Sequence, residues 1–145
     1  LRKALEKLDD DFDYVFVDSP PSLGLLTINA LVGADRIIVP IQCEYFALEG
    51  LGQLIETIGI VRNLNPEIEI GGVLLTMFDS RTNLSSQVVK EVQEFFKDLV
   101  FKTVIPRNVK LSEAPSYGQP IHMYDTHSSG ADAYDKLSDE FIARF

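Results

Sequence analysis

Hydrophobic runs that are typical of strands alternate along this chain with segments in which apolar residues recur every three or four positions. Four runs are nearly continuous, at residues 14–18, 36–41, 70–77 and 102–106. Runs of this kind are typical of strands whose two faces are both covered. Alternation of such strands with helices predicts an α/β fold, in which a parallel sheet carries helices on both faces.

The segments of helical period predict helices at residues 2–8, 24–32, 48–58 and 84–96, and a closing helix after Gly130 that reaches Phe145. Ser22 is a plausible N-cap for the second of these. An acidic turn at residues 9–11 follows the first helix. We interpret the apolar stripes of these helices as core.

Composition and charge narrow the class of protein. The chain has 145 residues, 46% of them hydrophobic, which fits one globular domain with a sizeable core. Its net charge of −9 argues against a uniformly basic nucleic-acid surface and favours a soluble cytosolic protein. The single cysteine, Cys43, forms no internal disulfide and is expected in the core. No apolar stretch is long enough to span a bilayer.

In a parallel sheet, ligands collect outside the carboxyl ends of the strands. The sequence places Asp18 and residues 42–45, 77–81 and 106–110 at those ends. Asp18 can hold a magnesium-bound water beneath a triphosphate, or it only caps the turn before Pro20. Glu44 either contacts a ligand there or is an exposed acid near a helix start.

The fourth run is followed by Pro106 and Asn108, and an amide at that position can read the edge of a purine base. A simple turn at Asn108 is the alternative. From Arg81 to Lys110 there are six Lys or Arg residues and three acids. This basic region is either a phosphate-binding face or a solvated helix of mixed charge.

One motif is missing from the 145 residues. No Gly-x-x-x-x-Gly-Lys-Ser/Thr loop, which would cradle phosphates, occurs in them.

Taken in order, residues 12–33, 39–50, 72–82, 102–116 and 118–134 resemble the ParA/Soj-type chromosome and plasmid partition ATPases. The most specific motifs are DSPPSLG at residues 18–24, QCEY at 42–45 and IPRNVKLSEAPS at 105–116. The resemblance implies a deviant Walker-type P-loop NTPase fold of the SIMIBI type. It also implies a cytoplasmic, nucleoid-associated homodimer that sandwiches ATP and Mg²⁺, binds DNA without sequence preference, works with a ParB/Spo0J-like partner and segregates DNA cargo.

The same resemblance implies roles for particular residues. Asp18 would order magnesium through water, and Glu44 would lie near the nucleotide of the facing protomer. Pro106 and Asn108 would border adenine. The basic residues that face DNA phosphates would be Arg81 and Lys110.

The sequence also departs from the family pattern. Lys110 stands where many relatives have arginine, and residues 125–130 lack the basic residues that the family often has there. The resemblance covers only the carboxy-terminal portion of such a protein. We therefore expect residues 1–145 to be the carboxy-terminal part of one ParA-like ATPase domain, without catalytic residues and inactive alone. The alternative is a non-catalytic module that binds DNA or a protein partner.

Overall fold

The computed structural model describes residues 1–8, 12–20, 22, 24–45 and 49–145. They fall into two units, Leu1–Ile37 with Leu48–Gly71, and Ile38–Ala47 with Gly72–Phe145. The predicted acidic turn at 9–11 lies outside the described residues. Among the described helices, none is long and apolar enough to cross a membrane.

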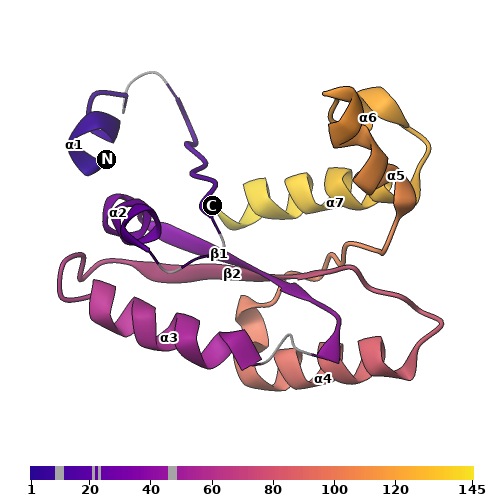
Figure 1. The fold of residues 1–145 in the computed structure, drawn as a ribbon, viewed down its shortest axis with the longest axis horizontal. Helices are drawn as coiled ribbons and strands as arrows, with labels where there is room; N and C mark the ends of the chain where they lie inside the picture. Colours follow the sequence, from indigo (N-terminus) through magenta and orange to yellow (C-terminus); the bar gives the residue numbers. More distant parts are fainter. Residues whose placement is uncertain (9–11, 21, 23, 46–48) are drawn as a thin grey trace. The chain divides into compact units, whose positions relative to one another are not determined.

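The first unit is mainly helical. It contains α1 (Arg2–Leu5), α2 (Leu25–Gly33) and α3 (Glu49–Val61) (Figure 1). Its core is built on Leu31, Val61 and Ile68. The buried Asn65 side chain donates from Nδ2 to the carbonyls of Leu31, at 3.2 Å, and Ala34, at 2.8 Å. These bonds satisfy carbonyls at the end of α2 that have no partner within the helix.

The strand predicted at residues 14–18 is wrong. These residues belong to no strand of the described sheet, and the side chains from Tyr14 to Val17 are 39–73% exposed. A hydrophobic run favours a strand, but it does not by itself set the register of a strand ladder. Ser22 is not the N-cap of α2 either: Gly24 occupies that position, and Thr27 Oγ1 donates to the Ser22 carbonyl at 2.6 Å.

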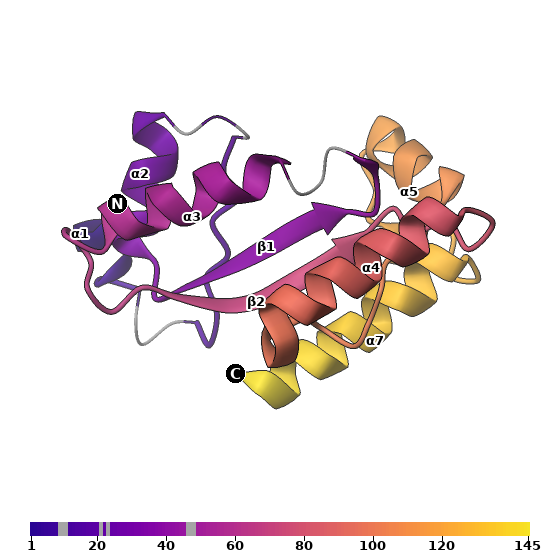
Figure 2. The same cartoon turned by 90° about the horizontal axis from the view of Figure 1, so that it is seen from below.

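The second unit is organised on the sheet formed by β1 (Arg36–Gln42) and β2 (Glu69–Thr76). The two strands run in parallel, and both were predicted. Around them lie α4 (Asn83–Phe96), η2 (Lys97–Leu99), α5 (Val109–Glu113), η3 (Ala114–Tyr117), α6 (Ile121–Tyr124) and α7 (Ser129–Arg144). Helices α4 and α7 lie on opposite sides of β2 (Figures 1 and 2). The predicted class, a parallel sheet with helices on both faces, is confirmed.

Burial in β2 follows from this arrangement. Its residues from Gly71 to Leu75 are all buried, as predicted for a strand covered on both sides. On the α7 side, Leu74 packs with Phe101, Ile105 and Ala133. The ring of Phe101 lies so close to Gly72 that a Cβ there would be 2.3 Å from Cε2. The absence of a side chain at Gly72 therefore makes room for Phe101.

The strand predicted at residues 102–106 is also wrong, although the segment does lie beside β2. Two isolated parallel bridges flank it, Val73 with Val100 and Phe78 with Pro106. Phe101 donates to the Val73 carbonyl and Ile105 to the Leu75 carbonyl, each at 2.9 Å. The acceptors are two residues apart and the donors four, so residues 102–104 leave the ladder and the strand is interrupted.

Candidate functional site

Three of the predicted strand ends meet in the second unit. The Cys43 amide donates to the Thr76 carbonyl at 2.8 Å, which ties the end of β1 to the end of β2. The Phe78 amide donates to Ile105 at 3.1 Å, and the Arg107 amide donates to Phe78 at 2.8 Å. Residues 42–45, 77–81 and 106–110 therefore share one rim, where ligands of parallel sheets usually bind.

Glu44 forms an ion pair at this rim with Arg107. Both side chains are about half exposed, at 47% and 46%. A half-exposed pair is weakly held, so either charge remains available to a ligand. Sequence reasoning assigned no role to Arg107. Its position between Pro106 and Asn108 was the available signal.

Beside this pair is a hollow of about 450 Å³ whose lining includes Cys43, Glu44, Met77, Asp79 and Arg107. Burial raises the pKa of the Cys43 thiol to about 11, so the thiol stays protonated and is a poor nucleophile. Cys43 is 2% exposed, which confirms it as a core residue. Its carbonyl accepts a hydrogen bond from Ser85 Oγ at 3.1 Å.

The backbone at the end of β2 is strained. Met77 has a φ of 54°, in the left-handed region that favours glycine. Such a conformation costs about 1–3 kcal/mol and persists where the surrounding structure holds it in place. It turns the chain from β2 toward Asp79. No sequence signal marked Met77 for this conformation.

Arg81 is held by Asp79, another residue that sequence reasoning did not single out. The guanidinium donates from Nε to Oδ1 at 2.9 Å and from Nη2 to Oδ2 at 2.7 Å, and the Arg81 amide donates to Oδ1 at 3.0 Å. These bonds hold the pKa of Asp79 well below its ordinary value. The Arg81 side chain is 83% exposed, against 16% for Asp79. The cation therefore faces solvent while its carboxylate anchors it.

Asn108 acts as the N-cap of α5. Its Oδ1 accepts from the Lys110 amide at 2.7 Å, and its Nδ2 donates to Ser129 Oγ at 2.8 Å. The turn that was the alternative for Asn108 is thus present in the structure. One N–H of its amide group is not used by these two bonds, so contact with a base remains geometrically open.

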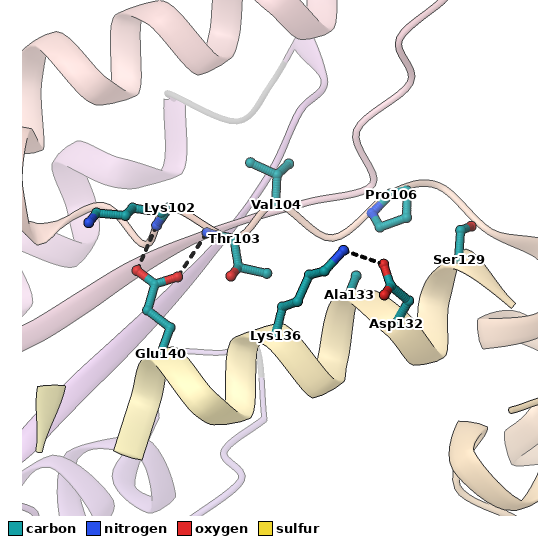
Figure 3. Close-up of a pocket in the computed structure, with 9 residues that line it drawn as sticks. All are labelled: Lys102, Thr103, Val104, Pro106, Ser129, Asp132, Ala133, Lys136 and Glu140. Atoms are coloured by element: carbon teal, nitrogen blue, oxygen red, sulfur yellow. Dashed lines mark hydrogen bonds and ion pairs between the residues drawn. The ribbon is translucent and has the colours of Figure 1, made fainter. Parts of the chain in front are cut away.

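Pro106 lies in a second hollow, of about 600 Å³, between residues 102–106 and α7 (Figure 3). Val104, Pro106 and Ala133 give it apolar surface, while Lys136 and Asp132 pair across one turn of α7 at 2.6 Å. An apolar wall with polar groups beside it suits a flat ring such as a purine.

Glu140 closes one end of that hollow. Its carboxylate accepts from the amides of Lys102, at 2.7 Å, and Thr103, at 2.9 Å (Figure 3). Burial acts to raise the pKa of Glu140, but these amides and the nearby Arg144 outweigh it, and the pKa is lowered. Glu140 therefore holds the segment that leaves the β2 ladder.

Asp18 belongs to the first unit and is described apart from this rim. It is exposed and follows residues 14–17, which belong to no helix or strand. Glu44, Pro106 and Asn108 are brought to one rim of the second unit. Among the described residues, no three His, Cys, Asp or Glu side chains gather at a distance that suits a metal ion.

Comparison with known proteins shows which proteins this chain is similar to. Residues 1–70 match a family model described as an AAA domain. The chain is 56% identical to the sporulation initiation inhibitor protein Soj of Bacillus subtilis, over 99% of this chain and 57% of that protein. It is 54% identical to the chromosome partitioning protein ParA of Myxococcus xanthus, over 99% of this chain and 51% of that protein.

A solved structure has a fold similar to that of this chain. Cobyrinic acid a,c-diamide synthase from Mycobacterium smegmatis, with a bound ATP analog and magnesium, matches with a TM-score of 0.76 and 39% identity. The match covers 97% of this chain and 51% of that one, and it supports the predicted P-loop NTPase fold. The chain spans about half the length of the curated relatives it matches. By sequence, it is similar to the Soj and ParA chromosome-partitioning proteins, as its motifs predicted.

Proposed function

We propose that this chain is the carboxy-terminal part of a ParA-type partition ATPase domain, which couples ATP-dependent dimerisation and nonspecific DNA binding to the segregation of DNA cargo. The observation that carries the proposal is the shared rim of Glu44, Arg107 and Asn108, together with 56% identity to Soj. A ParB/Spo0J-like partner and a place on the nucleoid belong to the same proposal.

The residues fit ATP and Mg²⁺ in part. Pro106 and Val104 offer an apolar wall for adenine, and Asn108 has an N–H available for its edge. Asp18 offers an exposed carboxylate that can accept from magnesium-bound water. No glycine-rich phosphate loop occurs in the 145 residues. Magnesium would neutralise charge on the phosphates, and this chain would supply the acid that orders it and the surface that positions the base.

We expect these 145 residues by themselves to hydrolyse no ATP, because most groups that neutralise phosphate charge are not among them. The test is magnesium-dependent phosphate release by the purified chain, alongside the complete protein that contains these residues. Turnover by the complete protein alone supports the proposal. Turnover by the 145-residue chain would contradict the expectation that its phosphate-binding half lies elsewhere.

The second candidate is a DNA- or partner-binding module that needs no nucleotide. The observation that favours it is that hydrogen bonds within the chain hold the rim together. Nonspecific DNA binding at low salt without nucleotide, lost when Arg81 and Lys110 are both changed to Ala, would support it. Equal inertness of both proteins without nucleotide would exclude it.

A further inference from the structure

Both cations proposed to face DNA are paired with a carboxylate of their own chain. Arg81 is bonded to Asp79, and Lys110 Nζ lies 2.9 Å from Glu113 Oε2. A cation that already has an anionic partner attracts a phosphate less strongly than a free one, because the phosphate must share or displace that partner. The two pairs differ in how much of the cation they leave available.

Arg81 can keep its partner and still bind a phosphate. Asp79 uses Nε and Nη2 of a guanidinium that has five N–H donors in a planar fork. With the side chain 83% exposed, the remaining donors face solvent. Asp79 therefore orients the Arg81 guanidinium and leaves its remaining N–H donors available to a phosphate.

The Lys110 side chain is less exposed than that of Arg81, at 46% against 83%. Its ammonium is a compact charge with three donors, and one of them points at Glu113. The Tyr124 hydroxyl donates to the same Glu113 oxygen at 2.9 Å, and the Tyr124 ring centre lies 5.6 Å from Lys110 Nζ. The hydrogen bond that Lys110 donates to Glu113 raises the pKa of Lys110. The acid is fixed from two sides, so it stays where it opposes an incoming phosphate.

We propose that Glu113 is an internal competitor for Lys110, so that the Glu113 carboxylate and a phosphate of duplex DNA compete for the Lys110 ammonium. This inference rests on the proposed DNA binding. Glu113 weakens the contact and lowers its salt dependence, because a neutralised lysine releases fewer counterions from DNA. The carboxylate remains bonded to Tyr124 when Lys110 leaves it, so the exchange keeps the contact between α5 and α6.

The test is the affinity of the complete protein, with ATP and Mg²⁺, for a 30-base-pair duplex of mixed sequence, followed by fluorescence anisotropy from about 50 to 200 mM salt. Glu113→Gln keeps the shape and the acceptor for Tyr124 but removes the charge. We expect it to raise affinity about two- to fivefold, the size expected for loss of one exposed ion pair. The salt dependence should steepen by nearly one counterion.

Two variants make the test specific. Glu94→Gln changes net charge equally and releases Lys90 from an exposed pair at 3.8 Å on α4, outside both hollows. It should change affinity much less than Glu113→Gln. In a Lys110→Ala background, Glu113→Gln should have no effect beyond that of Glu94→Gln. Unchanged thermal unfolding confirms that the exposed variants fold.

The possible outcomes distinguish the competitor role of Glu113 from the proposed DNA binding. If wild type binds DNA and Lys110→Ala weakens binding, yet Glu113→Gln binds as wild type does, the competitor role is wrong while DNA binding stands. If Glu113→Gln gains no more affinity than Glu94→Gln, the gain comes from the change in net charge, and the competitor role is again wrong. If no variant binds DNA, the proposed DNA binding fails and this inference fails with it.

Discussion

Residues 14–18 and 102–106 carry similar hydrophobic runs, and neither forms the strand that its pattern predicts. In the first segment, the side chains from Tyr14 to Val17 are exposed. Around the second, Phe101 is 1% exposed and Ile105 is 2% exposed, and their amides bond to β2. A hydrophobic run therefore determines neither burial nor strand formation by itself, and the second run is buried where Phe101 and Ile105 bond to β2. The predictions below test this difference.

The largest expected difference is between two phenylalanines. Phe101→Ala removes a fully buried ring and should lower the free energy of unfolding by about 3–5 kcal/mol. Phe16 is 73% exposed, so Phe16→Ala should cost less than about 0.5 kcal/mol. Urea unfolding of the 145-residue chain measures both. A cost for Phe16→Ala near that for Phe101→Ala would mean that residues 14–18 are buried after all.

A smaller effect is expected at Gly72, against which Phe101 packs. Gly72→Ala places a Cβ 2.3 Å from the Phe101 ring and should destabilise the chain by about 1–3 kcal/mol. The matched control is Gly59→Ala in α3, where a Cβ meets nothing within 4 Å. That change should stabilise by about 0.5–1 kcal/mol, since alanine favours a helix. Equal melting temperatures for the two variants would contradict the close packing at Gly72.

The third prediction concerns the acid that holds residues 102 and 103. Glu140→Gln should lower the free energy of unfolding at pH 7 by about 1–2 kcal/mol, because a neutral amide accepts two backbone bonds less well than a carboxylate.

This effect should depend on pH. The pKa of Glu140 is lower when folded than its ordinary value of 4.5, so its contribution is complete above pH 4.5 and is lost as pH falls through the folded pKa. Denaturant midpoints at pH 7 and pH 3 measure it. The gap between wild type and Glu140→Gln should shrink at pH 3. A gap that stays constant would show that the carboxylate charge is not what holds the segment.

The sequence was sufficient to predict β1, β2 and the longer helices, because the hydrophobic runs of the strands and the apolar stripes of the helices are long and unambiguous. It also predicted the common rim of residues 42–45, 77–81 and 106–110, since parallel strands end at one edge of the sheet. It could not predict the pairing of Glu44 with Arg107, 63 residues apart, or the strained backbone of Met77. The ion pair depends on tertiary packing and the φ of Met77 on the local backbone path, and the hydrophobic pattern encodes neither.

Local acids explain why the basic residues were harder to interpret. Counting charges from Arg81 to Lys110 showed an excess of bases, but Asp79 lies just outside that range and Glu113 just beyond it. Both acids pair with the residues in question. The charge excess of a segment therefore overstates the charge that it presents to a phosphate.

The most direct test of the proposed function is the role of Asp18. In the complete protein that contains these residues, Asp18→Asn should abolish most magnesium-dependent ATP hydrolysis, because an amide orders magnesium-bound water poorly. The matched control is Asp13→Asn, which removes an exposed acid from the same segment. The account predicts that Asp13→Asn keeps wild-type turnover while Asp18→Asn loses at least tenfold, the loss that about 1.4 kcal/mol of transition-state stabilisation produces. Equal turnover by the two variants would contradict it.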